Sequence, residues 1–345
     1  MNRRQTAALG VALAALLAAV GCASPAPRAA GPAAVRPAPP PRERVRLIYT
    51  SQGPTHAPIW LAQEGGHFLA NALDVELTFV AGSATATQAL LAGEAEVVAQ
   101  GASAPVSAAL DGGDTLLVAT THGTLVHVLA GASSLASLDG LRGGVVGVAL
   151  YGTTADFAAR VALQQAGLEP GGDVTVVQTG GNAETLSALQ GGAIQAALVP
   201  DVFGFELQRL GYPRLLDLAD LPVEYCYSGL ATTRAFTEER PQTVRRVLRA
   251  VVQGMSQFVR EPATAKRVLA RHSQLTDPAT LDYAWEAHAT KYLKRAPYTT
   301  SAAVQRVLDG LAARQESART AVPEAFYDNR FVAELDESGF LATLY

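Results

Sequence analysis

Apolar residues follow two spacings along the chain, and the two spacings alternate. Short apolar or β-branched runs, such as VRLIYT (45–50) and VELTFV (75–80), are bounded by Gly or polar residues and predict strands. Between them, PIWLAQEGGHFLA (58–70) and ATATQALLAG (84–93) have helical spacing. From Val45 the order is βαβαβ, which predicts a parallel sheet covered by helices.

The same order of segments returns from Val145. The second set is VVGVAL (145–150), TADFAARVALQQAG (154–167), VTVVQTG (174–180), AETLSALQGG (183–192) and IQAALVP (194–200). Beyond Leu230 the pattern changes to long amphipathic helices such as PQTVRRVLRAVVQGMSQFVREP (241–262). We therefore expect an α/β fold of two equivalent lobes with a crevice between them, and C-terminal helices that pack on the first lobe.

Polar residues and glycines concentrate in the loops that follow the predicted strands. These exit loops are SQGPTHAP (51–58), AGSAT (81–85), QGASAP (100–105), YGTTAD (151–156), TGGNAE (179–184) and PDVFG (200–204). In open α/β sheets, ligands bind beyond the carboxyl ends of strands, where helices present free N–H groups. Gly lets the backbone approach a ligand, and hydroxyl groups hydrogen-bond to it. A simpler interpretation also holds, in which Thr154, Asn182 and Asp201 each serve only as a helix cap.

Composition excludes several classes of function. The 345 residues are 49% hydrophobic, which is enough for a large core in two lobes, and the net charge is −4. Without a clustered basic surface, we expect no nucleic-acid partner. The six histidines do not have the spacing of a zinc site, and neither a GxSxG motif nor a P-loop occurs. We therefore expect no metal and no cofactor.

The N-terminus predicts export and anchoring. Arg3 and Arg4 precede an apolar run that ends in small residues, so residues 1–21 are a predicted signal peptide. The run is too short for a comfortable membrane span. AAVGC (18–22) resembles a bacterial lipobox, which predicts lipidation of Cys22. The Pro- and Ala-rich residues 22–44 predict a tether. The other cysteine, Cys226, is interpreted as a packed apolar residue.

Several longer stretches together resemble one family. They include APIWLAQEGGHFLANALDVELTFVAGS (57–83), QALLAGEAEVVAQGASAPVSAAL (88–110) and GLATTRAF (229–236). With the export signal, the tether and the two lobes, the chain resembles the NMT1/THI5-like or SsuA-like solute-binding proteins of bacterial ABC transporters. The resemblance covers about residues 45–335. Members of this group bind nitrate, sulfonates, taurine or thiamine precursors.

This resemblance implies a type II periplasmic-binding-protein fold, with residues 45–122 and 230–345 in lobe I and 123–229 in lobe II. It also implies a monomeric substrate-binding lipoprotein, periplasmic or at the cell surface, that captures a small organic solute between the lobes for an ABC permease and its ATPase. The ligand-binding residues carried over from the family are Gln52, Thr55, His56, Ser83, Thr85, Ala102, Ser103, Thr153, Thr154, Asp156, Asn182 and Asp201. These loops contain no Arg or Lys, so a strongly anionic solute would depend on helix N-termini and hydroxyl groups.

Two alternatives remain open at this point. The same fold carries enzymes, namely pyrimidine-precursor synthases and chorismate dehydratase-like proteins, although the cysteine-rich motif of the former is represented here only by the isolated Cys226. The second alternative is a ligand-sensing domain that docks on a membrane partner. We expect binding without catalysis, because the loops contain no recognisable catalytic set.

Overall fold

The computed structural model describes residues 42–345. The predicted signal peptide, the predicted lipidation site Cys22 and nearly all of the predicted tether lie outside the described residues. The first strand begins at Glu43, two residues before the expected start at Val45. No helix in the described part of the chain is long and apolar enough to cross a membrane.

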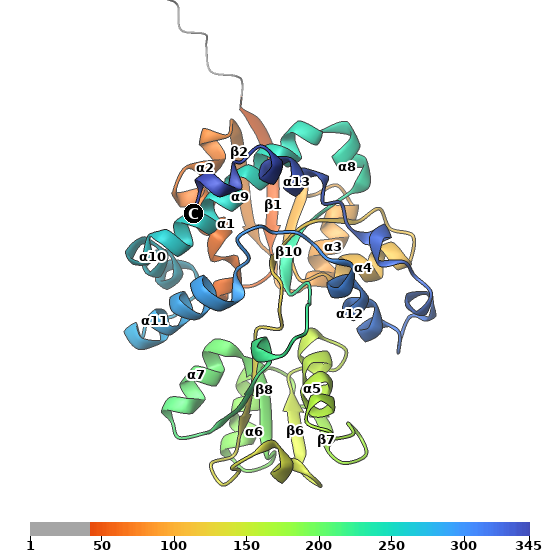
Figure 1. The fold of residues 1–345 in the computed structure, drawn as a ribbon, viewed down its shortest axis with the longest axis vertical. Coiled ribbons are helices and arrows are strands. Elements are labelled where there is room, and N and C mark those ends of the chain that lie inside the picture. The colour runs from red at the N-terminus through yellow and green to blue at the C-terminus, as the bar shows by residue number, and fades with distance from the viewer. Residues whose placement is uncertain (1–41) are drawn as a thin grey trace, which may run out of the picture. The chain divides into compact units, whose positions relative to one another are not determined.

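The first of two five-stranded sheets has the strand order β2-β1-β3-β10-β4 (Figure 1). Its strands are β1 (Glu43–Tyr49), β2 (Leu73–Phe79), β3 (Val97–Gln100), β4 (Leu116–His122) and β10 (Ser228–Thr232). The strands β1, β2 and β3 pair in parallel, as the βαβαβ order predicts, whereas β10 is antiparallel to β3 and β4. β3 and β4 are buried along their whole length, because helices cover both faces of this sheet.

The second sheet has the corresponding order β7-β6-β8-β5-β9. Its strands are β5 (His127–Gly131), β6 (Val145–Val148), β7 (Thr175–Gln178), β8 (Ala196–Pro200) and β9 (Arg214–Asp217). Here β5 is the antiparallel strand next to β8 and β9. Val45 and Val145 therefore belong to different sheets, and the predicted α/β fold of two lobes is confirmed.

Helices flank both sheets. The first sheet carries α1 (Ala57–Glu64), α2 (His67–Ala70), α3 (Ser83–Leu91) and α4 (Ser103–Leu110), and the second carries α5 (Thr154–Gln165), α6 (Asn182–Gln190) and α7 (Asp201–Arg209). The C-terminal helices are α8 (Arg234–Glu239), α9 (Pro241–Arg260), α10 (Pro262–His272), α11 (Pro278–Ala287), α12 (Ser301–Leu311) and α13 (Arg330–Glu337).

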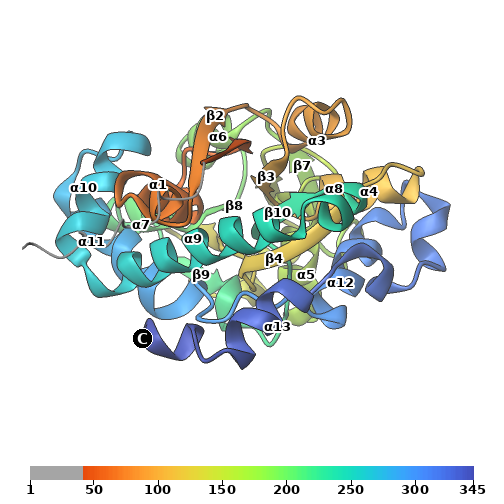
Figure 2. The ribbon, with the colours of Figure 1, turned by 90° about the horizontal axis from the view of Figure 1, so that it is seen from above.

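The long helix α9 joins the C-terminal region to the first lobe. Its apolar stripe, including Val244, Val247 and Val251, is buried in the same cluster as Val45 and Leu47 of β1. Figure 2 shows α9 running across the first lobe beside α1. The expectation that the C-terminal helices pack on the first lobe is confirmed, because the amphipathic helix α9 buries its apolar face against β1 and α1.

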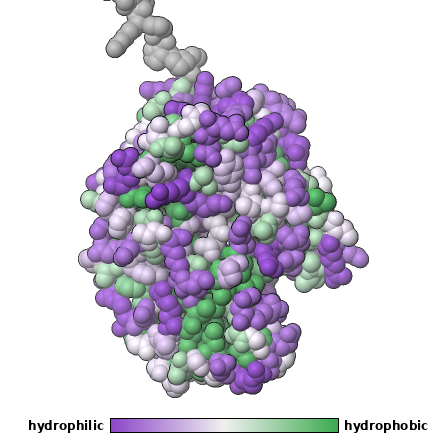
Figure 3. All heavy atoms as spheres, viewed as in Figure 1, coloured by the Kyte–Doolittle hydropathy of each residue, from purple (hydrophilic) through white to green (hydrophobic). Residues whose placement is uncertain are grey.

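Two segments connect the lobes. The first runs from the end of β4 at His122 to the start of β5 at His127, and the return segment precedes β10. The return crossing therefore comes before Ser228–Thr232, which is itself a strand of the first sheet. The space-filling view shows hydrophobic surface on the second lobe, next to a hollow between the lobes (Figure 3).

Candidate functional site

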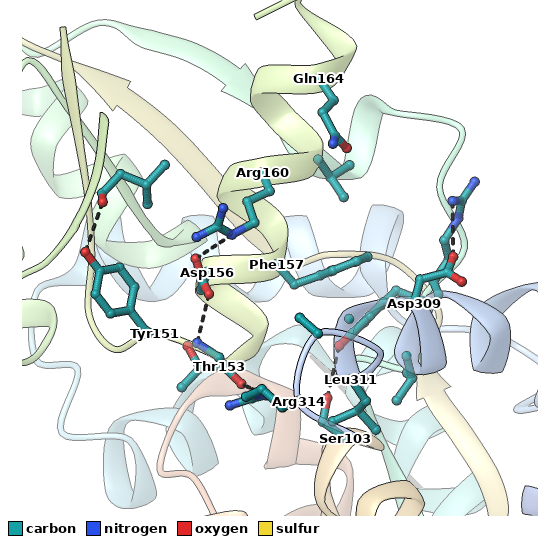
Figure 4. Close-up of a pocket in the computed structure, with 18 residues that line it drawn as sticks. Ser103, Tyr151, Thr153, Asp156, Phe157, Arg160, Gln164, Asp309, Leu311 and Arg314 are labelled. Carbon is teal, nitrogen blue, oxygen red and sulfur yellow. Dashed lines mark hydrogen bonds and ion pairs between the residues drawn. The ribbon is translucent and has the colours of Figure 1, made fainter. Parts of the chain in front are cut away.

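A cleft of about 780 Å³ lies between the two lobes (Figure 4). The second lobe lines it with the loop before α5 and with one side of that helix, from Tyr151 to Gln164. The first lobe adds Ser103 at the start of α4, and the C-terminal half of α12 with the segment after it adds residues between 306 and 314. This volume is within the usual range for sites that bind small molecules, and both lobes contribute to its walls.

The loop before α5 is held in shape by its own polar groups. Gly152 has a φ of +68°, a left-handed conformation that favours glycine. Its N–H donates to a carboxylate oxygen of Asp156 at 2.8 Å, and Arg160 Nε donates to the other oxygen at 3.0 Å. The hydroxyl group of Thr153 donates to the Leu150 carbonyl oxygen at 2.8 Å. Asp156 and Thr153 therefore order the loop that presents the start of α5 to the cleft.

The helices at the exit loops begin without side-chain caps. Thr154, Asn182 and Asp201 are each the first residue of their helix, and the preceding residue makes no side-chain hydrogen bond to the helix in α5, α6 or α7. The interpretation of these three residues as simple helix caps is therefore wrong. The amide groups of a first helical turn have no partner within the helix, so those of α5 can donate into the cleft.

Arginines line the cleft, although none lies in the exit loops. Arg314 Nη2 donates to the Gly152 carbonyl oxygen at 2.6 Å, and so links the segment after α12 to the second lobe. Arg160 pairs with Asp156, and Arg306 lies 3.6 Å from Asp309. A solute in the cleft would thus meet guanidinium groups as well as amides and hydroxyls. The spacing of Asp156 and Arg160 on one helix face could have indicated Arg160, but no local pattern indicated Arg314.

An aromatic pair forms another wall of the cleft. The ring of Phe157 stacks on that of Tyr225 with a centroid distance of 5.2 Å. Tyr225 lies in the return crossing, and its hydroxyl group is 3.1 Å from the hydroxyl group of Ser103. Burial raises the pKa of Tyr225, so its hydroxyl group keeps its proton at neutral pH. The cleft therefore combines an apolar aromatic surface with hydrogen-bonding groups.

The structure brings only some of the predicted site residues together. Ser103, Thr153 and Asp156 line the cleft, and Thr154 begins the helix beside them. The remaining candidates do not line this cleft; they are Gln52, Thr55, His56, Ser83, Thr85, Ala102, Asn182 and Asp201. The ligand-binding roles of the predicted residues stay predictions.

Thr55 and His56 have partners within the first lobe. The ring of His56 is buried, with Nε2 lying 3.0 Å from the carbonyl oxygen of Ala99 and Nδ1 lying 3.2 Å from the Thr55 hydroxyl group. Gln52 is exposed, and its side-chain oxygen accepts from Gln274 Nε2 at 3.4 Å. The polar side chains of the first exit loop thus have hydrogen-bond partners within the first lobe and the C-terminal region on it.

Cys226 has the environment of a packed residue. It is 2% exposed, and burial raises the pKa of its thiol to about 11. The Thr120 hydroxyl group lies 3.5 Å from its sulfur atom. A protonated and inaccessible thiol is a poor nucleophile. Among residues 42–345, no group of three or more His, Cys, Asp or Glu side chains could hold a metal ion.

Two α/β lobes, two crossings and an intervening cleft define a two-lobed protein of the periplasmic-binding-protein type. The NMT1/THI5-like family matches residues 53–265, which is more than half of the chain. The chain belongs to this family, and the resemblance seen in its sequence is confirmed.

Solved structures share this architecture. The alkanesulfonate-binding protein SsuA from Xanthomonas axonopodis pv. citri, bound to MOPS, has a TM-score of 0.66 and 17% identity, covering 84% of this chain and 99% of that one. The ligand-binding component of an ABC-type import system from Staphylococcus aureus, with zinc bound, has a TM-score of 0.67 and 13% identity, covering 85% and 99%. At these identities the likeness shows the fold alone.

An enzyme is also similar in structure. The desulfurization enzyme DSZB has a TM-score of 0.63 and 16% identity, covering 86% of this chain and 99% of that one. None of the curated proteins matches the chain in sequence. The fold by itself therefore does not separate binding from catalysis, and the chemistry of the site has to do so.

Proposed function

We propose that the protein is the solute-binding component of an ABC importer, which captures a small organic solute between its lobes and delivers it to a permease and its ATPase. The observation that supports this most directly is that one cleft is lined from both lobes. A solute bound there would contact both lobes at once and so favour the closed arrangement. Solved relatives that bind alkanesulfonate or belong to an import system add support.

The chemistry of the cleft favours binding over catalysis. Asp156 is held by Gly152 and Arg160, and Tyr225 keeps its proton, so neither is placed as a free general base. Cys226 is buried and protonated. Guanidinium groups, helix amides and hydroxyls suit the oxygen atoms of a solute, and the rings of Phe157 and Tyr225 suit an apolar body.

A thermal-shift screen of the purified full-length protein tests this proposal. Sulfonates, nitrate, pyrimidines, aromatic acids and small amides are the classes to compare. A solute present at 100 times its Kd should stabilise the protein by about 2.7 kcal/mol, and it should be recovered unchanged after prolonged incubation. Conversion of the solute to a product by the pure protein would instead favour an enzyme, and the absence of binding by any class would contradict the proposal.

We further propose that the protein is exported and held at a membrane through a lipid on Cys22. This proposal rests on the apolar run before AAVGC and on the Pro- and Ala-rich stretch that follows. Intact-mass measurement of the membrane fraction should show a chain that begins at diacylglyceryl-modified Cys22. A Cys22→Ser variant should lose the modification, and wild-type protein cut at another residue would refute the lipid anchor.

A further inference from the structure

The helix α11 and the single π-helical turn after it, His288–Tyr292, connect the two lobes at the flank formed by α7. We call residues 278–292 the clasp. The clasp belongs to the C-terminal region on the first lobe, because Trp285 Nε1 donates to the Phe258 carbonyl oxygen at 2.9 Å and Asp282 pairs with Lys266 at 2.6 Å. α11 also lies against α7 of the second lobe (Figures 1 and 2).

Stacking and ion pairs fasten the clasp to the second lobe. The ring of Tyr283 stacks on that of Phe205 with a centroid distance of 4.4 Å and an interplanar angle of 6°. Lys291 Nζ lies 2.7 Å from carboxylate oxygens of both Asp217 and Asp220. Lys291 is 31% exposed and Asp217 only 6%, so this pair is screened less than a fully exposed one. The clasp therefore resists separation of the lobes even without a solute.

Buried groups at the base of the clasp are only partly satisfied. His288 Nε2 lies 3.3 Å from Asp201 Oδ2, with these side chains 1% and 3% exposed, yet neither atom makes a well-formed hydrogen bond. His127 Nδ1 is buried without a hydrogen-bond partner as well. His122 Nε2 lies 3.2 Å from His288 Nδ1. Incomplete satisfaction of buried polar groups is costly, which makes this junction easy to open.

Two of these histidines flank the first crossing between the lobes. His122 is the last residue of β4 and His127 is the first residue of β5, so a bend in the intervening residues changes the surroundings of both. The titratable and charged groups that face this junction come from the first exit loop, β4, β5, α7, β9, the return crossing, the clasp and the segment after it: His56, His122, His127, Asp201, Arg214, Asp217, Asp220, Tyr227, Tyr283, His288, Lys291, Tyr292 and Lys294.

Of the two buried carboxylates at the junction, one has two cationic partners and the other has none besides the histidines. Arg214 and Lys291 both contact Asp217, which leaves Asp201 as the carboxylate near His127 and His288. Burial lowers the pKa of His127 to about 4, against the partial opposing effect of Asp201. Burial together with the charge of His288 lowers the pKa of His122 well below its usual value. Both rings are therefore neutral in this arrangement of the lobes at neutral pH.

We propose that the clasp is an acid-sensitive release, which holds the lobes together at neutral pH and lets them part when the histidines at the crossing take up protons. The direction follows from linkage. A histidine that becomes exposed on opening regains a pKa near 6.5, so the open form binds protons first as the pH falls. The contribution of this histidine to the stability of the closed form is complete above about pH 7, and it is lost progressively as the pH falls to about 4. Between pH 7.5 and 5.0, one such histidine shifts the ratio of open to closed forms about 30-fold.

The test measures lobe separation in the full chain without any solute. Leu69 of the first lobe and Leu210 after α7 are exposed, so cysteines at these positions in a Cys22→Ser background can carry a fluorophore pair. We expect energy transfer to fall reversibly from pH 7.5 to 5.0, while the far-UV circular dichroism stays constant. His127→Gln should lower the midpoint pH of this change. His272→Gln alters a histidine within the first lobe and should leave the midpoint pH unchanged.

A second pair of variants does not depend on the buried histidines. Lys291→Met removes the ion pairs to the second lobe and should lower energy transfer already at pH 7.5. Arg44→Met removes an ion pair of the same length, 2.7 Å, to Glu76 between β1 and β2 of the first lobe, and it should have no such effect. Energy transfer that is constant from pH 7.5 to 5.0, or unchanged by Lys291→Met, would overturn the proposal. Release of solute is the part that rests on the proposed function, and this readout needs no solute, so the two proposals can fail separately.

Discussion

Replacing Gly254 with alanine is expected to destabilise the protein by about 3 kcal/mol or more. Gly254 lies in α9 where this helix crosses α1, and a Cβ atom there would be 2.1 Å from the Pro58 carbonyl oxygen and 2.9 Å from the Ala62 backbone nitrogen. Both are backbone atoms of a buried helix, so relief requires the two helices to move apart. Overpacking of this kind commonly costs 1–3 kcal/mol, and the separation of two core helices adds to that cost.

Gly310→Ala provides the matched control for this change. Gly310 is also a helical glycine, but its added Cβ would be 3.1 Å from the side-chain ring of Phe157, which can shift. Here alanine gains helix propensity, so the free energy of unfolding should change by about 1 kcal/mol or less. Denaturant unfolding followed by circular dichroism measures both variants. If alanine were tolerated equally well at both positions, this result would contradict the close approach of α9 and α1.

The second large effect concerns Arg314 and the solute. An Arg314→Met variant should bind the solute identified by the screen about 10- to 150-fold more weakly, because a hydrogen bond to a charged group contributes about 1.5–3 kcal/mol. Arg314 lies in the cleft and donates to the Gly152 carbonyl oxygen. Its side chain is exposed, so the unliganded protein should melt almost as before. Isothermal titration calorimetry measures the affinity.

One further variant, with a control, separates the effect of the position of the guanidinium group from the effect of its charge. Gly152→Ala would place a Cβ 1.8 Å from Arg314 Nη1, which would push the guanidinium group out of its place while keeping its charge in the chain. It should weaken binding in the same direction and also destabilise the left-handed residue by about 1–2 kcal/mol. Arg319→Met is the control, because Arg319 follows in the same segment but does not line the cleft. Equal affinity in Arg314→Met and the wild type would place the solute elsewhere.

Much of the framework followed from spacing along the chain. The alternation of VRLIYT with a helical segment predicted β1 and α1, and the return of this order from Val145 predicted the second sheet, because apolar periods of two and about 3.6 residues reflect local geometry. The exit loops were found for the same reason, and Ser103 and Thr153 from these loops line the cleft. Interpretation of single loop residues was less secure, since Thr154 begins α5 and does not cap it.

The sequence alone therefore determined the two α/β lobes, their order, the family and the loops at the carboxyl ends of the strands. Only the tertiary structure decided which charged groups distant in the sequence meet. Arg314 reaches Gly152 from 162 residues away, and Lys291 reaches Asp217 from 74 residues away. No local period encodes such pairs, because they depend on how α12 and the clasp pack on the rest of the chain. The cleft thus contains arginines that the exit loops lack, since helices from the end of the chain supply a wall of a site whose loops were already evident in its sequence.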